Sequence, residues 1–277
     1  AFRTYRRNPG FTAVALATLA LGIGANTAMF GLVRGVLLRP LPYPQAERLV
    51  TTNASLPDFE DLRRGATAFH DTAVWASNLY LLAGEGPAEQ VRGAVVSERF
   101  FPMLGEAALG RALGPADARD KLLVLGHGLW TPRFGADPGV LGRGVRLWGE
   151  LYTVIGVVPP EFQYPSGQFE LWVPMAQAMA GPASGQAQNR GLRIFRVLAR
   201  LKPGIALAQA QAESDAIAQR LEAEHRETNE GIRFAWVPLF ERLVGDVRRA
   251  LWLLMGVVAL VLLIAAGNVA NLLLARA

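Results

Sequence analysis

The 277-residue sequence contains no cysteine and only three histidines, and these shortages remove several kinds of chemistry. Without cysteine the chain has no disulfide, no thiolate metal ligand and no cysteine nucleophile. His70, His127 and His225 lie far apart and lack metal-ligand spacing, so each is interpreted as a surface or turn residue. No P-loop motif (GxxxxGK[ST]) and no nucleophile elbow (GxSxG) is present. We therefore expect no catalytic residue, no metal and no cofactor.

Charge is missing from two long stretches, one near each end of the chain. No charged residue occurs from Ala250 to Ala275 or from Asn8 to Val33. An α-helix of about 20 apolar residues crosses a hydrocarbon core of about 30 Å. A signal peptide usually has an apolar stretch of only about 7 to 15 residues, which is shorter than the first stretch here. The sequence therefore predicts a membrane protein with two transmembrane α-helices, in residues 1–40 and 247–277, that flank an extracytoplasmic segment.

The net charge of +5 does not arise in the segment between these helices. Residues 1–39 hold five arginines and no acid, and Arg276 follows the second stretch, so residues 40–275 hold 22 basic and 23 acidic side chains. This balance excludes the basic surface that binding to a phosphate backbone needs, and we expect no nucleic-acid partner. By the positive-inside rule, the arginines at the start place the N-terminus in the cytoplasm and residues 41–246 outside.

Three arginines stand at the outer ends of the expected helices. Arg248 and Arg249 lie on the outer flank of the second helix, against the positive-inside pattern, and Arg34 lies near the outer end of the first. Long arginine side chains snorkel to lipid headgroups, and we favour this interpretation over a buried charge in a transport path.

Small residues line one face of the first helix, and two asparagines share a face of the second. In lipid, small residues allow helices to approach closely, and an asparagine is costly unless it finds a hydrogen-bond partner. Two helices alone offer these asparagines little, so we expect further helices or subunits as partners, with membrane lipid around them. The predicted helix-packing residues are Ala20, Gly24, Ala28, Gly31, Gly35, Asn268 and Asn271.

Strand and helix patterns alternate at both ends of the outer segment. The expected elements are a strand at 49–53, a helix at 57–69 and strands at 73–75, 79–83 and 88–97, followed far downstream by a strand at 192–201, an amphipathic helix at 206–226 and a strand at 232–239. Both ends of the segment return to the same bilayer surface. We therefore expect residues 41–104 and 191–246 to form one α+β domain containing two βαβ units.

Residues 105–190 are richer in glycine and proline and are predicted to form an inserted β-rich lobe. Its expected strands are 121–125, 145–148, 152–158 and 171–173, with a tight hairpin at Gly149 and Glu150. A small lobe needs large side chains to bury enough area, so we interpret its aromatic residues as core and not as an exposed ligand platform. These residues are Trp130, Phe134, Trp148, Tyr152, Phe162, Tyr164, Phe169 and Trp172.

Ordered motifs run through nearly the whole chain. They include 6–12 (RRNPGFT), 38–44 (LRPLPYP), 100–105 (FFPMLG), 124–130 (VLGHGLW), 133–135 (RFG), 152–157 (YTVIGV) and 267–276 (GNVANLLLAR). In this order they resemble the extracytoplasmic core domain of MacB/FtsX-type ABC transporter permeases, and the ends resemble the large duplicated permeases of that group.

The resemblance implies a four-helix permease module of the cell inner membrane. Its long periplasmic loop, with a porter-like α+β part and an inserted lobe, follows the first helix. The implied partners are a separate cytoplasmic ABC ATPase and further permease helices or a second permease copy, and a periplasmic adaptor is left open. Because the chain stops after the second expected helix, we expect it to be a fragment or a truncated product.

The expected function is non-catalytic transmission of ATP-driven motion to the outer domain, for export or for mechanotransmission. The alternative is a two-span membrane receptor with an extracytoplasmic ligand-sensing domain. The sequence leaves the substrate, the ATPase and the oligomeric state open.

Overall fold

The computed structural model of the chain describes residues 9–37, 40–84, 86–105, 107–180 and 184–274. The chain divides into two compact units, Ala1–Leu41 with Phe240–Ala277, and Pro42–Leu239. We call the first unit the helix pair and the second the outer domain, and describe each by itself.

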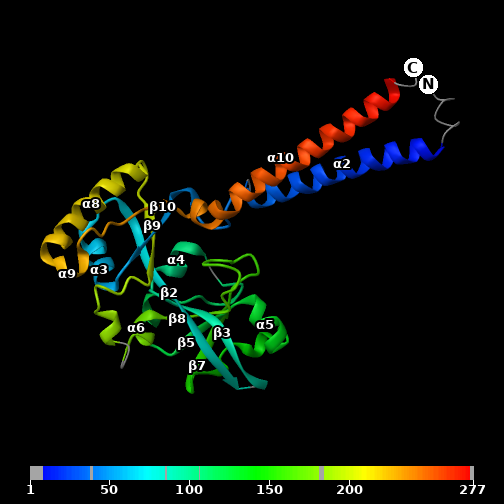
Figure 1. Cartoon of the computed structure of the whole chain (residues 1–277). Coiled ribbons are helices and arrows are strands. Elements are labelled where there is room, and N and C mark those ends of the chain that lie inside the picture. The colour runs from blue at the N-terminus through cyan, green and yellow to red at the C-terminus, as the bar shows by residue number, and fades with distance from the viewer. Residues whose placement is uncertain (1–8, 38–39, 85, 106, 181–183, 275–277) are drawn as a thin grey trace. The chain divides into compact units, whose positions relative to one another are not determined.

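The helix pair consists of α2 (Pro9–Leu37) and α10 (Leu239–Leu274), which lie side by side in Figure 1. Among the described residues, one segment is long and apolar enough to cross a membrane: Val247–Gly267 in α10, with a mean hydropathy of 2.6. The first span is not confirmed and stays a prediction. Residues 240–246, which were expected to belong to the outer domain, are the first turns of α10.

In the described part of the outer domain, ten strands form one sheet with the order β10-β1-β9-β2-β3-β8-β5-β7-β4, and β6 pairs with β2 and β7. The strands are β1 (Leu49–Ala54), β2 (Phe69–Gly84), β3 (Gly86–Val96), β4 (Leu109–Gly110), β5 (Leu122–Leu125), β6 (Gly144–Leu147), β7 (Glu150–Val157), β8 (Leu171–Pro174), β9 (Phe195–Leu201) and β10 (Val237–Pro238). The helices are η1 (Ala46–Arg48), α3 (Leu56–Gly65), α4 (Phe100–Leu104), η2 (Pro115–Asp117), α5 (His127–Phe134), η3 (Pro138–Val140), α6 (Met175–Ala178), α7 (Ser184–Ala187), α8 (Leu207–Glu224) and α9 (Arg226–Asn229).

Two interleaved βαβ units build one end of this sheet. In β1–α3–β2 the two strands are parallel because both pair antiparallel with β9, which lies between them. In β9–α8–β10 the two strands likewise pair antiparallel with β1. The two predicted βαβ units are therefore confirmed, and each unit supplies a strand that lies between the strands of the other.

The helices α3 and α8 pack against each other beside this end of the sheet (Figure 1). The predicted apolar stripe of α8 is buried at Ala210, Ser214, Ile217 and Leu221. The helix expected at 57–69 ends at Gly65, because the backbone turns extended at Ala66. The N–H groups that follow, of Thr67 and Ala68, donate to the carboxylate of Glu213 on α8, at 2.6 and 2.8 Å.

Two strand predictions near β2 and β10 were wrong in length. The strands expected at 73–75 and 79–83 are one 16-residue strand, β2, because its pairing with β3 continues through residues 76–78 between them. The strand expected at 232–239 is reduced to Val237–Pro238. The side chain of Gln211 on α8 donates to Phe234 O at 2.7 Å and accepts from Trp236 N at 3.0 Å. These main-chain groups therefore bond to a side chain and not to a neighbouring strand.

The strands of residues 105–190 continue the same sheet. Strand β3 pairs parallel with β8, with Val95 opposite Val173, so hydrogen bonding crosses the boundary expected at residue 105. The division into a core part and an inserted lobe stays a prediction. The hairpin between β6 and β7 is present, but its turn is at Trp148 and Gly149, with φ of 49° and 83°, since Glu150 already pairs with Leu147.

Candidate functional site

The two helices of the pair meet along one antiparallel face. A Cβ atom added to Gly22 would lie 2.8 Å from Leu262 Cδ1, so the helices approach closely here. Nearer the other end of α2, Met29 and Val33 form a buried cluster with Leu251. The absence of a side chain at Gly22 thus permits the contact with Leu262.

Asn26 lies within this contact face, and sequence analysis missed it. Its Nδ2 donates to Gly22 O on its own helix at 3.2 Å and to Val258 O on α10 at 3.4 Å. An interhelical hydrogen bond of this kind contributes about 0.6 kcal/mol in membrane helices. The signal was available, because the rule that singled out Asn268 and Asn271, a lone amide in an apolar stretch, also applies to Asn26.

The three glycines predicted to pack helices have no contact with α10 in the part of the chain that the structure describes. At 100° per residue, Gly24, Gly31 and Gly35 lie on the side of α2 opposite Val33. A Cβ atom added at any of these glycines would have no atom within 4 Å, and Ala20 and Ala28 are exposed. On α10, Asn271 is also exposed, and the side chain of Asn268 lies outside the described residues. The packing role of all seven residues stays a prediction.

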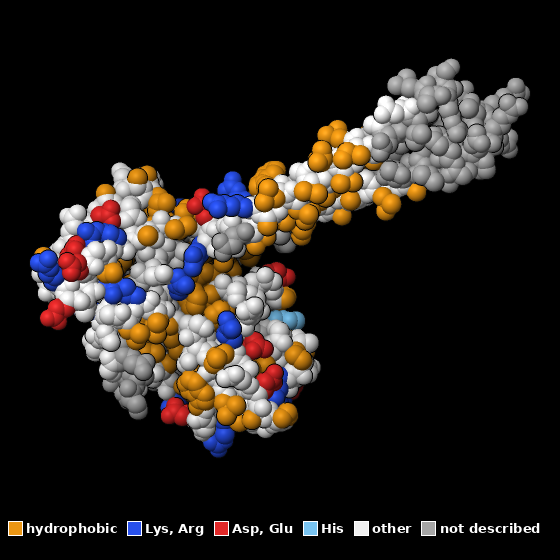
Figure 2. Space-filling model, viewed as in Figure 1, with side chains coloured by type: hydrophobic (Ala, Val, Ile, Leu, Met, Phe, Trp, Pro, Cys, Tyr) orange, Lys and Arg blue, Asp and Glu red, His pale blue; other side chains and the backbone are white. Residues whose placement is uncertain are grey.

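The exposed surface of the helix pair is strongly apolar, as Figure 2 shows along α10 and α2. Leu253 is 74% exposed and Leu263 is 69% exposed. Only 11% of the most apolar window of α10 is buried within the protein. Such a surface is stable in a hydrocarbon environment or against other apolar helices.

Both connections to the helices leave the outer domain through neighbouring strands. Strand β1 follows α2 after a short connection, and β10 directly precedes α10. These strands are paired antiparallel, with Val50 opposite Pro238 and Thr51 opposite Val237. The start of β1 therefore lies beside the end of β10, so both chain connections are at the same end of the sheet. We call this region, residues 43–51 with Val237–Pro238, the junction.

Two arginines fasten the junction to strand β9. Arg48 Nε donates to Leu201 O at 2.8 Å, and its Nη2 donates to the same oxygen. Arg200 is 7% exposed; its Nη1 donates to Pro44 O, and its Nη2 donates to Met103 O of α4 at 2.6 Å. Burial, together with the nearby charge of Arg48, lowers the pKa of Arg200 from its ordinary value. Main-chain carbonyl groups of two segments, at Pro44 and at Met103, thus converge on one buried guanidinium.

Tyr43 anchors the same connection in an aromatic cluster. Its ring meets Phe162 edge-on at 5.9 Å and Tyr164 edge-on at 6.3 Å between centroids. Burial raises the pKa of the Tyr43 hydroxyl to about 12, so this tyrosine is neutral at physiological pH. Tyr43 and Pro44 are therefore held both by hydrogen bonds and by ring packing.

A buried charge cluster joins α3 to the segment before β9. Asp58 is 1% exposed and accepts from Arg190 Nη1 at 2.7 Å and from Asn229 Nδ2 at 3.0 Å. Arg190 Nη2 also donates to Asp61 at 2.7 Å, and Arg193 lies 3.5 Å from Asp58. The basic partners of Asp58 and Asp61 lie about 130 residues downstream, so local sequence patterns do not reveal this cluster.

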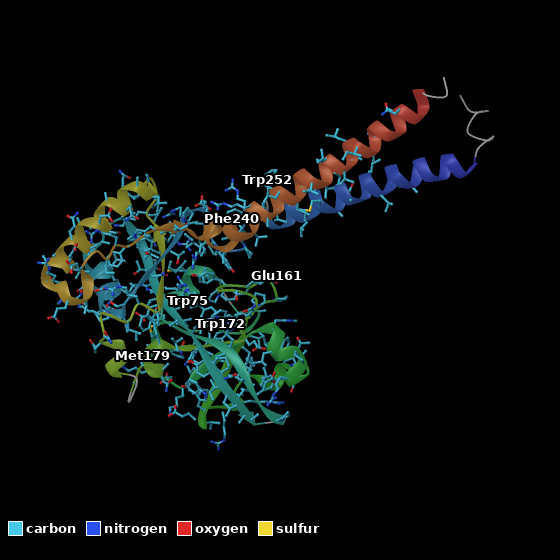
Figure 3. The ribbon with its side chains drawn as sticks, in the orientation of Figure 1. Trp75, Glu161, Trp172, Met179, Phe240 and Trp252 are labelled. Carbon is cyan, nitrogen blue, oxygen red and sulfur yellow. The ribbon has the colours of Figure 1, made fainter. Side chains whose placement is uncertain are left out.

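A cleft of about 350 Å³ opens between α3, β2 and α6. Its apolar wall includes Leu56, Phe59, Met175 and Met179, and Met179 is labelled in Figure 3. Two ion pairs lie on its rim, with Arg63 2.6 Å from Glu60 and Arg99 3.7 Å from Asp71. The hydrogen bonds that Arg63 donates to the Glu60 carboxylate raise the pKa of Arg63. The rim therefore presents paired charges beside an apolar wall.

The histidines do not form a site in the described residues. His70 lines the cleft, His127 begins α5 and His225 ends α8. No group of three or more histidine or acidic side chains in the described part of the chain could hold a metal ion.

Of the eight lobe aromatics interpreted as core, four are buried, three are partly buried and one is exposed. Trp172, Tyr164, Tyr152 and Phe162 are at most 9% exposed, whereas Trp148 is 58% exposed. Trp172 packs edge-on against Phe162 at 5.4 Å and against Phe101 at 6.1 Å. Figure 3 labels Trp172 beneath Trp75, which packs edge-on against Tyr164 at 5.8 Å. The aromatic core thus joins residues from both expected parts of the outer domain.

Comparisons with known proteins show which proteins have a similar sequence or fold. The sequence profile of the MacB-like periplasmic core domain matches residues 12–217. The structure is similar to that of the periplasmic region of MacB from Actinobacillus actinomycetemcomitans, with a TM-score of 0.54 and 14% identity over 80% of this chain and 97% of that chain. It is also similar to a domain assigned to a permease protein from Porphyromonas gingivalis, with a TM-score of 0.52 and 16% identity over 71% and 91% of the two chains. No curated protein matches the sequence.

Proposed function

This chain belongs to the family of MacB-like periplasmic core domains, the periplasmic part of MacB/FtsX-type ABC transporter permeases, and we propose that it transmits ATP-driven motion from a cytoplasmic ATPase to its outer domain. In this proposal the chain is a non-catalytic part of a multi-pass permease of the inner membrane. The helices α2 and α10 both span the membrane, and the outer domain moves when they move.

The junction is the observation that supports this proposal best. Because β1 and β10 are hydrogen-bonded neighbours, the two helices connect to the sheet at one place. A movement of the helices would displace the paired residues Val50 and Pro238 together. The whole sheet would then rotate as a rigid body. The hydrogen bonds of Arg48 and Arg200 connect this region to β9. Strand β9 belongs to one βαβ unit and lies between the two strands of the other.

The outer domain can turn as one body because its core is continuous. Closely packed interiors have low compressibility and transmit strain. The single sheet and the aromatic cluster connect the junction with strands as distant as β8. Motion introduced at Tyr43 would therefore reach the cleft without local unfolding.

The helix pair needs partners for this role. The small residues on the outer side of α2, from Ala20 to Gly35, are open to close approach by a further permease helix or by a second permease copy. Asn271 is exposed and would find its hydrogen-bond partner in the same assembly. Lipid covers the remaining apolar surface.

The proposal is tested with the complete permease that contains this chain, reconstituted with candidate ABC ATPases. Because the chain has no cysteine, two introduced cysteines can carry spin labels, one on α10 and one on the outer domain. We expect the ATPase to co-purify and ATP to change the distance between the labels. Arg200→Ala should retain ATPase binding and hydrolysis but reduce the change in distance, because it removes the junction contacts to Pro44 and Met103.

Arg64→Ala is the matched control, because Arg64 is an exposed arginine of α3 away from the junction. It should behave like the parent protein. Failure of every such ATPase to associate would overturn the proposal, and an ATP-independent response to a ligand added at the cleft would favour the receptor alternative.

A further inference from the structure

Three arginines and one tryptophan occur at the same level of the helix pair. Val33 and Leu251 belong to one buried cluster. Arg34 follows Val33 directly, Arg248 and Arg249 precede Leu251 by less than one turn, and Trp252 follows it. At about 1.5 Å per residue, all four lie within roughly one helical turn of each other along the pair. This level coincides with the start of the apolar segment Val247–Gly267.

Helical geometry also places Arg34 and Arg248 on the same flank of the pair. On α2, Arg34 is one residue after Val33 and therefore about 100° further around the helix. On α10, Arg248 is three residues before Leu251, a rotation of about 300°, which places it about 60° to one side of Leu251. Because the helices run antiparallel, these two rotations lead to the same side. Trp252, labelled in Figure 3, is about 100° beyond Leu251 and reaches that side as well. Arg249 lies farther round α10.

These arginines have no acidic partner among the described side chains. Arg34, Arg248 and Arg249 are exposed, and none of them takes part in an ion pair or hydrogen bond there. In the outer domain, by contrast, Arg190 is paired with Asp58 and Asp61. Two unpaired guanidinium groups on one flank can bind one oxyanion together.

The surroundings of the pair indicate which anion this is. Exposed apolar side chains follow Trp252 along α10, with Leu253 74%, Leu254 48% and Val257 56% exposed. Trp252, 56% exposed, has the amphipathic ring that is enriched at the headgroup level of membranes. A free anion would use the arginines only, whereas a phospholipid would use the arginines, the ring and the apolar surface.

We propose that Arg34 and Arg248, with Trp252 beside them and Arg249 in support, bind the phosphate of an anionic phospholipid at the outer surface of the membrane. This inference rests on the proposed spanning of the membrane by the helix pair. Guanidinium groups bind phosphate oxygens through paired N–H bonds, and their long stems can extend along the apolar surface. The bound lipid would link α2 to α10 at the end nearest their connections to the sheet.

The test measures which lipids remain on the full chain, without any ATPase. The chain is placed in phosphatidylcholine nanodiscs that contain a minor share of phosphatidylglycerol, extracted in mild detergent, and its bound lipids are counted by native mass spectrometry. We expect enrichment of phosphatidylglycerol. Arg34→Gln with Arg248→Gln should reduce this enrichment about thirtyfold, and either change alone about fivefold. The double lysine variant should keep most of it, because the positive charges remain.

Arg242→Gln is the matched control. Arg242 is an exposed, unpaired arginine of the same helix, but it lies nearly two turns before Arg248 and on the opposite side of α10 from Leu251. It should retain the enrichment. Equal loss in this variant would show general charge attraction and overturn the proposal, as would unchanged enrichment in the double glutamine variant.

Inorganic phosphate and glycerol phosphate are added in a second arm. Displacement of phosphatidylglycerol by either at similar concentration would overturn the lipid assignment in favour of a free-anion site. Because no ATPase is present, a negative result here leaves the transmission proposal standing, and a failed ATPase association leaves this result unchanged.

Discussion

The outer domain and the helix pair differ in where their apolar side chains go. In the outer domain, Trp172, Phe100 and Phe195 are at most 1% exposed. In the helix pair, the cluster of Met29, Val33 and Leu251 is small, and most large side chains of α10 face outward. The outer domain therefore satisfies its own hydrophobic requirements, whereas the helix pair depends on lipid or further helices. Substitutions in the outer domain should therefore change its folding stability, whereas substitutions in the helix pair should change its association with other helices or lipid.

The largest effect is expected at the aromatic core of the outer domain. Trp172→Ala removes a fully buried ring that contacts Phe101 and Phe162, and should lower the free energy of unfolding of the outer domain by about 3–5 kcal/mol. Urea unfolding followed by circular dichroism measures this change. Trp148→Ala is the control, because the 58% exposed Trp148 should change stability by less than about 1 kcal/mol.

A smaller loss is expected from the buried charge cluster. Arg190→Ala leaves the buried carboxylate of Asp58 with fewer partners and should cost about 3 kcal/mol. Arg64 also binds Asp61, but its side chain is 70% exposed, so Arg64→Ala should cost less than about 1 kcal/mol. Equal unfolding midpoints for these two variants would show that the cluster contributes no more than a surface ion pair.

Sequence patterns identified the two βαβ units because local periodicity determines them, but they did not show that the units interleave. The apolar stripe of α8 and the two-sided burial of β9 are visible in the residues themselves. The pairing of β3 with β8 and the substitution of Gln211 for a strand neighbour depend on residues far apart in the chain. For the same reason, the partners of Asp58 could not be foreseen.

The candidate site was only partly predictable. The small residues of α2 show which face permits close approach, but they do not show which helix approaches. In this chain α10 uses the opposite face, where Gly22 and Asn26 lie. The junction was not predicted either, because it arises from the pairing of β10 with β1, which the strand expected at 232–239 did not indicate.

A pH-dependent contribution is expected from Asp117, again in the outer domain. Hydrogen bonds from Arg111, and further from Gly114 N, lower the pKa of Asp117 below its ordinary value of 3.8 despite its burial. A carboxylate with a lowered pKa stabilises the folded state fully above its unfolded pKa. The stabilisation is lost as the pH falls from 3.8 through the folded pKa.

Urea unfolding of the parent protein and of Asp117→Asn at a series of pH values isolates this contribution. The difference between the two free energies should be constant above about pH 5 and should shrink below 3.8. A difference that stays constant down to the lowest accessible pH would contradict the lowered pKa.

The smallest effect on the outer domain is expected from substitutions of two glycines on opposite sides of α2. These substitutions also test most directly whether the helix pair keeps one face for a partner. With cysteines introduced at Val33 and Leu251, disulfide formation reports the contact of α2 with α10, since the chain has no other cysteine. Gly22→Val places atoms against Leu262, whose flexible end can partly yield, so the contact should weaken by about 1 kcal/mol and cross-linking should slow. Gly24→Val meets open space and should leave cross-linking unchanged.

Neither glycine variant should alter the unfolding of the outer domain, because both act only on α2. In the complete permease the order should reverse, with Gly24→Val weakening association with further helices more than Gly22→Val does. If Gly24→Val slowed the cross-link as much as Gly22→Val, the small-residue face would lie against α10. The helix pair would then have no surface reserved for a partner, and its difference from the self-sufficient outer domain would rest on lipid alone.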